Sequence, residues 1–410
     1  MGRADDQPST RTRTALPAIL VVLFATGWAA NHFTALLPIL AQSEGLGRTA
    51  IDGAFGIYAV GLLPGLLGGG TLSDRWGRRP LLLTGAAVAG LGNLALLCWH
   101  DQSGVFIGRL IVGAGVGVAM SAGTAWSADI GGGSGSVLAG VSLTAGFGCG
   151  PVISALLAQF TAAPVDVPFA VSVGLSATAV LTGAALARTA GAPESPASGR
   201  DVSADAGSHQ GVVAALGAAL PLAVWVFASA TTAMVTMVER MHYRFDGPLL
   251  PGMAAALTLS SGVVIQMVAR RREWGSSAGA AGALAAAIGF GTVAAAGATP
   301  SVAVFVAVAL VLGIAYGLCL RQGLVDVETL SPPRLRGTLT GIFWAVTYLG
   351  FGLPVLLVTI EPAVGITAPT IVLSVVAVAV AVLRVVRGSS AKPAAAHTVR
   401  DEADRNTQKI

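Results

Sequence analysis

GGGTLSDRWGRRPLLL, residues 68–83, places three arginines and one aspartate between two apolar stretches. A helix that crosses a bilayer needs about 20 predominantly apolar residues, and the chain on each side of this segment meets that requirement. An ionised side chain within the hydrocarbon layer is costly, so the charged segment must lie at a membrane surface. The stretch therefore predicts a short connection between two transmembrane helices.

The rest of the chain has the same character. Of its 410 residues 54% are hydrophobic and only 11% are charged, and the mean hydropathy is +0.76. The apolar stretches do not show the short alternating pattern of β-barrel strands. They predict an all-α polytopic membrane protein with twelve transmembrane helices, at 15–40, 52–71, 80–98, 104–127, 136–159, 168–188, 212–238, 248–269, 276–296, 301–324, 338–360 and 366–386.

The distribution of arginine and lysine predicts the orientation. Most of the 24 basic residues fall on one side of the membrane if the N-terminus is cytoplasmic, as the positive-inside rule requires. An even number of helices then returns the C-terminus to the same side. We expect an integral protein of the plasma (inner) membrane with both termini in the cytoplasm.

A polar segment divides the chain. APESPASGRDVSADAGSHQ (192–210) is rich in serine, alanine, glycine and aspartate and has too little apolar surface to order itself. The predicted organisation is a cytoplasmic N-terminal tail at 1–14, a six-helix bundle at 15–188, a cytoplasmic linker at 189–211, a second six-helix bundle at 212–386 and a disordered cytoplasmic C-terminal tail at 387–410.

The two halves contain related segments. GTLSDRWGRR at 70–79 matches GVVIQMVARR at 262–271, which keeps the first glycine and both final arginines and has Gln266 in place of Asp74. Both copies follow an even-numbered predicted helix. An internal repeat of this kind in a helical membrane protein is typical of secondary transporters, whose halves rock against each other around a midplane site.

The first copy has the chemistry of a breakable lock. Gly70 and Gly77 permit close backbone approach and a tight turn. Asp74 beside arginines supplies a charged contact that breaks when the halves rock. For Arg78 and Arg79 the alternative is that they only follow the positive-inside rule.

The pattern Gly-x-x-x-Asp-Arg-x-Gly-Arg-Arg resembles the cytoplasmic signature of the major facilitator superfamily, and with the two halves the resemblance covers almost the whole chain. It implies that Asp74 caps or pairs across the interface between the halves. It also implies that Arg75, Arg78 and Arg79 contact acidic groups and lipid headgroups. Asp129 resembles the acidic partner of this loop, although a solvated helix end is the alternative, and the GGGSGS that follows lacks the usual arginine.

Three polar residues are predicted inside the membrane. Arg109 precedes two glycines in a pattern similar to the family's Arg-x-x-x-Gly-x-Gly, which implies a cavity-facing arginine linked to proton coupling; snorkelling to the outer interface is the alternative. Asn31 and His32 lie in the outer half of the first helix. His32 has the chemistry to carry a proton and Asn31 to bind substrate, whereas a purely structural histidine is the alternative.

Two further sets of residues are candidates for an inner gate and for determining the direction of transport. Arg321, Asp326 and Glu328 cluster at the inner end of the tenth helix, as an ion-paired inner gate or as interfacial side chains. In the fifth helix, residues resemble part of the antiporter signature of the superfamily and favour export. They are Gly146, Gly150 and Pro151.

The sequence thus favours a secondary active transporter that exports a moderately hydrophobic small molecule, a drug or natural product, in exchange for protons. A proton-linked importer of a small metabolite and a transport-inactive membrane receptor are the alternatives. No ATP-binding signature, metal-type spacing or catalytic triad is present, so we expect no cofactor, no metal and no enzyme activity. The expected partners are the substrate, protons and the bilayer, without nucleic acid, and the expected state is monomeric.

Overall fold

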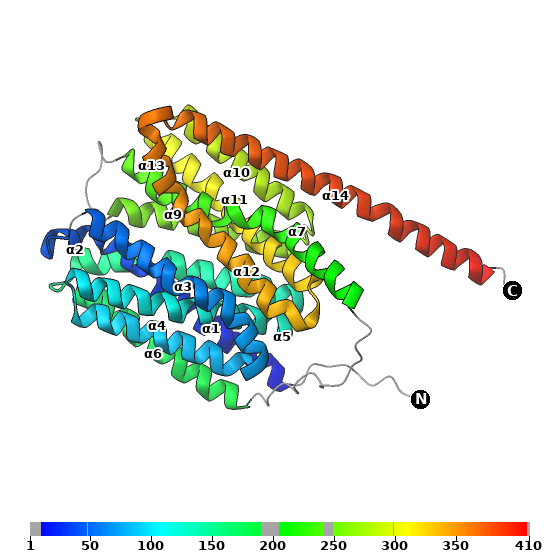
Figure 1. Cartoon of the computed structure of the whole chain (residues 1–410), viewed down its shortest axis with the longest axis horizontal. Helices are drawn as coiled ribbons and strands as arrows, with labels where there is room; N and C mark the ends of the chain where they lie inside the picture. The colour runs from blue at the N-terminus through cyan, green and yellow to red at the C-terminus, as the bar shows by residue number, and fades with distance from the viewer. Residues whose placement is uncertain (1–9, 47, 190–204, 242–248, 298, 408–410) are drawn as a thin grey trace.

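The computed structural model describes residues 10–46, 48–189, 205–241, 249–297 and 299–407. Within these ranges every regular element is helical. Figure 1 shows the helices from α1 to α6 lying together, and α7 with the helices from α9 to α14 forming a second group beside them. The protein is therefore an all-α membrane protein built from two pseudo-symmetric helical bundles.

The first bundle contains seven helical elements. They are α1 (Thr10–Asn31), the short 3₁₀ helix η1 (His32–Ala35), α2 (Leu37–Ser43), α3 (Arg48–Trp76), α4 (Arg78–Cys98), α5 (Gln102–Phe160) and α6 (Asp166–Thr189).

The second bundle begins with α7. Its elements are α7 (Asp205–Thr231), the π-helical turn η2 (Thr232–Thr236), α8 (Met237–Glu239), α9 (Leu249–Arg271), α10 (Ser277–Ala295), α11 (Val302–Leu330), η3 (Pro333–Leu335), α12 (Arg336–Leu349), η4 (Gly350–Gly352), α13 (Leu353–Val364) and α14 (Thr367–Thr407).

The structure contains the twelve predicted spans. Among the described residues, ten helices are long and apolar enough to cross a membrane, and the pair Pro333–Gly352 and Leu356–Val364, bent by 41°, forms one more. The 59 residues of α5 make two spans, because a straight helix of that length would measure about 90 Å against a hydrocarbon core of about 30 Å. The chain reverses at Gly132, where φ is 55° and ψ is −144°, and this brings Gly135 against the carbonyl of Ser127.

The predicted C-terminal tail and the end of the predicted linker are helical in the structure. The tail that we predicted to be disordered from residue 387 is helical to Thr407 as a continuation of α14, and its alanine-rich composition favours a helix. In the predicted linker, residues 190–204 lie outside the described residues. The last part of that linker, from Asp205, already belongs to α7.

Glycines allow the helices of the first bundle to approach closely. A side chain at Gly113 would meet the carbonyl of Tyr58 in α3, and one at Gly115 would meet the carbonyl of Gly85 in α4. Small residues at helix contacts are typical of membrane bundles, where dispersion rather than water release drives packing. This packing holds the first span of α5, which carries Arg109, between its neighbours.

The bundles meet along two main contacts, α3 with α12 and α5 with α9, and α5 also contacts α11. We call the end where α3 passes into α4 the Arg78 end, and the end where α4 passes into α5 the His100 end. Both the α3–α4 connection and the start of α12 lie at the Arg78 end, so the charged stretch at 68–83 sits where the two bundles touch.

Candidate functional site

The helices α3 and α12 touch at the Arg78 end through two glycines. A side chain added to Gly70 would overlap the carbonyl group of Gly337, and one added to Gly337 would lie 3.0 Å from Asp74 Oδ1. Gly77 forms the turn into α4 with φ of 93°, a conformation that residues with a side chain rarely adopt. These glycines bring the charged side chains of α3 and α4 against the second bundle.

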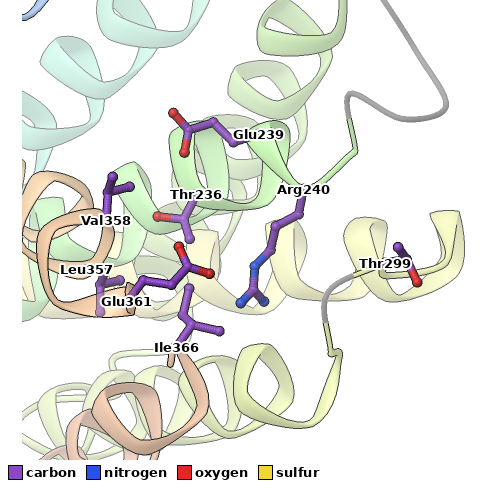
Figure 2. A pocket seen from close by; sticks show the side chains of 8 residues that line it. All are labelled: Thr236, Glu239, Arg240, Thr299, Leu357, Val358, Glu361 and Ile366. Atoms are coloured by element: carbon purple, nitrogen blue, oxygen red, sulfur yellow. The ribbon is translucent and has the colours of Figure 1, made fainter. Parts of the chain in front are cut away.

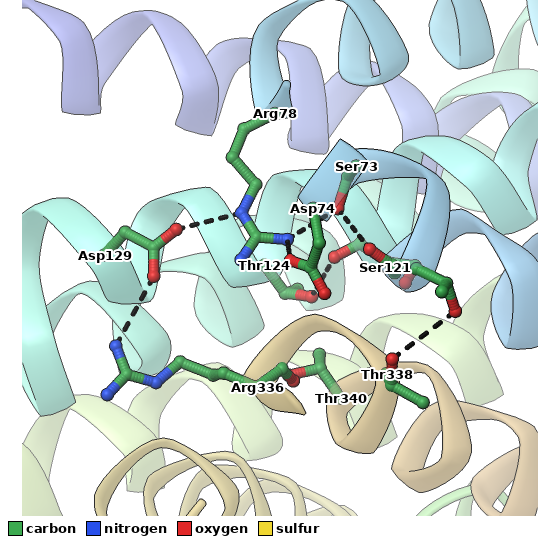
Figure 3. Close-up of polar contacts among 11 residues, drawn as sticks. Ser73, Asp74, Arg78, Ser121, Thr124, Asp129, Arg336, Thr338 and Thr340 are labelled. Atoms are coloured by element: carbon green, nitrogen blue, oxygen red, sulfur yellow. Dashed lines mark hydrogen bonds and ion pairs between the residues drawn. The ribbon is translucent and has the colours of Figure 1, made fainter. Parts of the chain in front are cut away.

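A relay of four charged side chains crosses the interface at this end (Figure 3). Arg78 Nη1 lies 2.5 Å from Asp74 Oδ1, and Arg78 Nε donates to Asp129 Oδ2 at 2.9 Å. The second carboxylate oxygen of Asp129 pairs with Arg336 Nη1 at 3.4 Å. The Asp74–Arg78–Asp129–Arg336 relay therefore runs through α3, α4 and α5 of the first bundle to α12 of the second.

Smaller polar contacts support the relay. Arg78 Nη1 also donates to Ser73 Oγ at 2.6 Å, and Ser73 Oγ donates to the carbonyl of Gly70 at 2.8 Å. The hydroxyls of Thr71 and Thr338 lie 3.4 Å apart across the interface. Both bundles thus contribute hydroxyls and charges to one contact.

The two remaining arginines of the stretch have other surroundings. Arg79 Nη2 donates to the carbonyl of Ala184 in α6 at 3.0 Å, which ties α4 to its own bundle. Arg75 is exposed beside Trp76, which is 68% exposed. An exposed arginine and tryptophan at a helix end suit the headgroup layer of a membrane.

Of the three residues of the predicted inner gate, Arg321 and Asp326 are linked through Gln322, whereas Glu328 points elsewhere. The carboxylate of Glu328 faces the turn of α5 at Gly132 and Gly133, across the interface. Asp326 instead points into the second bundle, where Arg384 Nη1 of α14 lies 2.7 Å from its Oδ2. Gln322 Nε2 donates to Asp326 Oδ1 at 2.7 Å, and Arg321 Nη1 donates to Gln322 Oε1 at 3.3 Å.

The Asp326–Arg384 pair yields a stability prediction. Both side chains are at most 10% exposed, so Arg384→Met leaves a carboxylate buried without its counter-ion. Removing one partner of a buried pair typically costs about 3 kcal/mol or more, whereas replacing both by apolar groups is often neutral. We expect Arg384→Met to lower the thermal unfolding temperature in detergent clearly, and the double variant Arg384→Met/Asp326→Leu to recover most of the loss. An unchanged melting temperature in the single variant would contradict this account.

Arg109 lies inside the protein and is 2% exposed. Its Nη1 donates to the carbonyl of Ala30 in α1 at 3.2 Å. The guanidinium carbon lies 4.7 Å from the ring centre of Phe33 and 4.0 Å from that of Tyr58. The side chain therefore packs between helices of the first bundle and does not extend to the membrane surface.

Asn31 and His32 make local contacts. Asn31 Nδ2 donates to the carbonyl of Phe147 in α5 at 2.8 Å. His32 is fully buried, with Nδ1 at 3.2 Å from the carbonyl of Trp28 and its ring edge-on to Phe169 of α6 at 5.4 Å. The imidazole thus lies between α1 and α6, an arrangement that a structural histidine would also show.

Two of the antiporter-like residues, Gly146 and Gly150, lie on the face of α5 that contacts α1. A side chain at Gly146 would meet the carbonyl of Phe24, and one at Gly150 would lie 3.2 Å from the amide nitrogen of His32. Pro151 lies within α5 and lacks an amide hydrogen for the helical ladder. These residues permit close packing of α1 on α5 within the first bundle.

Aromatic side chains occupy the centre of the interface. The ring of Phe227 in α7 lies within 6.5 Å of five others, and we call this set the central aromatic cluster: Phe147, Phe227, Tyr316, Trp344, Tyr348 and Phe351. Phe147 belongs to the first bundle and the others to the second. From the sequence we expect Trp344 to be one of the aromatic residues that line a largely apolar cavity, whereas nothing in the sequence distinguishes the other five from ordinary packing positions.

A few hydrogen bonds cross the interface within this cluster. Thr144 of α5 and Tyr316 of α11 lie 3.0 Å apart through their hydroxyls, and Gln266 Nε2 approaches Thr144 Oγ1 at 3.4 Å. Trp344 Nε1 donates to Thr124 Oγ1 at 3.4 Å. A mostly apolar centre with a few fixed polar groups suits a small organic ligand.

A separate cavity of about 370 Å³ lies within the second bundle at the His100 end (Figure 2). Arg240 and Glu361 point toward each other there, and Arg240 Nη1 donates to the carbonyl of Val293 at 3.4 Å. Burial lowers the pKa of Arg240, and Glu361 opposes that shift. The lining residues are Thr236, Glu239, Arg240, Thr299, Leu357, Val358, Glu361 and Ile366.

Curated relatives match only part of the chain. A segment is 33% identical over 98 residues to "Multidrug resistance protein MdtL" of Klebsiella pneumoniae subsp. pneumoniae, 24% of each protein. Another match is 37% identical over 81 residues to a "3-(3-hydroxy-phenyl)propionate transporter" of Escherichia coli strain K12, 20% of each protein. The matched segment thus spans a quarter or less of these relatives.

A solved structure and a family model each match most of this chain. The crystal structure of the human organic anion transporter MFSD10 (TETRAN) superimposes with a TM-score of 0.72 at 19% identity, over 92% of this chain and 100% of that one. This similarity concerns the fold. The family model of the Major Facilitator Superfamily matches residues 18–354, which include the relay, Arg109 and the whole central aromatic cluster. The chain belongs to the Major Facilitator Superfamily.

Proposed function

We propose that this transporter exports a moderately hydrophobic small molecule, a drug or natural product, across the inner membrane in exchange for protons. It works as a monomer by alternating access, with the two bundles at 15–188 and 212–386 rocking about the substrate. The positive-inside rule puts the Arg78 end and both termini in the cytoplasm.

The relay at the Arg78 end carries this proposal. Asp129 holds Arg78 of its own bundle and Arg336 of the other, so the Asp129–Arg336 ion pair helps to close the cytoplasmic end and must break when that end opens. Its side chain is 36% exposed, and ion pairs with this exposure contribute little to stability. A contact that is specific and weak suits a switch between two conformations of similar energy.

The centre of the interface supports the substrate class. The central aromatic cluster offers large apolar surfaces from both bundles, with Thr124, Thr144 and Gln266 as polar groups. Aromatic surfaces bind apolar bodies through area burial and ring stacking. A sugar would require many more hydrogen-bonding groups than this centre provides.

Proton-driven export is tested in everted vesicles. With an imposed inside-acid gradient, substrates from a panel of lipophilic antibiotics and dyes should raise the internal pH, reported by an entrapped pH dye. We expect Asp74→Asn and Arg109→Ala to abolish the alkalinisation, and Arg387→Gln, an exposed arginine outside the interface, to leave it intact. Transport that persists after the proton gradient is collapsed would contradict proton coupling.

Import is the second candidate. The substrate class of this alternative has one supporting observation, because a matched relative is named as a transporter of a small metabolite, 3-(3-hydroxy-phenyl)propionate. The same vesicles decide the direction, since an importer accumulates substrate from the opposite side. Specific binding without flux in either direction would instead identify a receptor.

A further inference from the structure

The buried charge of Arg109 lacks a fixed counter-ion. It lies about 10 Å along α5 from the start of the helix, and among the described residues no carboxylate forms an ion pair with it. A buried ionised group is costly unless it is paired and hydrogen-bonded. The protein thus keeps a cation near the bundle interface. Among the described residues, two aromatic rings and one backbone carbonyl stabilise this charge, and no carboxylate balances it.

The surroundings of the guanidinium leave donors unused. The rings of Phe33 and Tyr58 cover the group, and a cation is attracted to the face of an aromatic ring. Nη1 donates to the carbonyl of Ala30, and Nε has no acceptor in the described part of the chain. A guanidinium has five N–H donors in one plane, arranged to bind a carboxylate through two parallel hydrogen bonds.

This group lies next to the central aromatic cluster. Tyr58, which covers Arg109, neighbours Tyr348 of α12, and both tyrosines interact electrostatically with Arg109. Tyr348 in turn lies 4.6 Å from Phe227 at the middle of the cluster. A ligand with its anionic group at Arg109 would therefore place its body against aromatic rings from both bundles.

We propose that the substrate is an organic carboxylate with an aromatic-sized apolar body, and that Arg109 is its counter-ion. This inference rests on the proposed transport function and specifies the substrate of the same site. Binding such an anion neutralises the charge that the empty protein holds in the membrane. A cationic substrate would be repelled, because it would approach a buried arginine that has no counter-ion among the described residues.

The test compares a carboxylate with a neutral ligand of nearly the same shape. 4-Phenylbutyrate and 4-phenylbutanamide are titrated at pH 7 into the full chain in lipid nanodiscs, with tryptophan fluorescence or calorimetry as the readout. We expect the acid to bind at least tenfold more tightly, which corresponds to about 1.4 kcal/mol. Arg109→Gln should remove this preference, Arg109→Lys should retain part of it, and Arg387→Gln should leave it unchanged, since Arg387 is exposed and donates to Gly217.

Equal affinity for acid and amide would overturn the proposal, as would a preference that survives Arg109→Gln or the failure of the folded wild type to bind the acid. If Arg109→Gln does not fold, the wild type and Arg109→Lys still decide. Binding is measured without a proton gradient, so it is independent of proton-driven flux. Lost acid preference with intact proton-driven flux rejects only this inference, and intact preference without such flux rejects only proton-coupled export.

Discussion

Oxidation of the double variant Thr71→Cys/Thr338→Cys is expected to reduce transport to the level of vesicles without protein. The two threonine hydroxyls lie 3.4 Å apart, one on α3 and the other on α12, so cysteine side chains at these positions can bring their sulfurs toward each other across the interface. The bond would hold the bundles together at the Arg78 end. Alternating access requires that end to open, so each transport cycle would stop with the bundles locked.

Transport is measured before oxidation, after oxidation and after reduction with dithiothreitol. The background variant has Cys98, Cys149 and Cys319 replaced by serine or alanine, because Cys98 is exposed and would otherwise react. Each single cysteine variant should remain active after oxidation. Full activity in the cross-linked double variant would show that the Arg78 end need not open.

The spans of this fold could be predicted because lipid offers the backbone no hydrogen-bond partners. Any long apolar segment must then form a helix, and its length alone identifies a span. The reversal at Gly132 can be predicted for the same reason, because GGGSGS separates two apolar stretches that are each long enough to span the membrane. Local composition therefore determines these features, and no long-range contact is needed to predict them.

The complete relay could not be predicted from the sequence, because its prediction requires knowing which helices pack against each other. Its members Asp74, Arg78 and Asp129 were identified by their resemblance to a family pattern. Arg336 was not identified, because its contact with Asp129 joins residues 207 positions apart. The signal in the sequence is the loop SPPRLRG (331–337), which occupies the position in the second half equivalent to GGGSGS and keeps the basic residues that GGGSGS lacks. Pairing of that kind depends on how α12 packs against α3 and α5.

Two carboxylates of the predicted inner gate point in different directions because of helix geometry. Asp326 and Glu328 are two positions apart, and two residues of an α-helix differ by about 200° around its axis. Asp326 therefore points into the second bundle toward Arg384, whereas Glu328 faces the turn of α5. Closeness in sequence at a helix end suggested one cluster, but helical geometry separates the two carboxylates.

Gly70→Val should abolish transport, whereas Gly68→Val should leave most of it. The glycines belong to the same run of three on α3, but a side chain at Gly70 would overlap the carbonyl group of Gly337 in α12, and one at Gly68 would meet only Leu72 at 3.5 Å. Valine costs the same helix propensity at both positions, so the pair isolates the effect of contact with the second bundle.

The expected defect is conformational and not a loss of folding. With valine at position 70 the α3–α12 contact cannot form, so the bundles are held apart at the Arg78 end and the relay cannot link Asp129 to Arg336. Flux should fall at least a hundredfold while elution and melting temperature stay near those of Gly68→Val. A membrane-impermeant thiol reagent should label Thr338→Cys faster in the Gly70→Val background. Slower or unchanged labelling together with normal flux would mean that close approach of Gly70 and Gly337 is not part of the transport cycle.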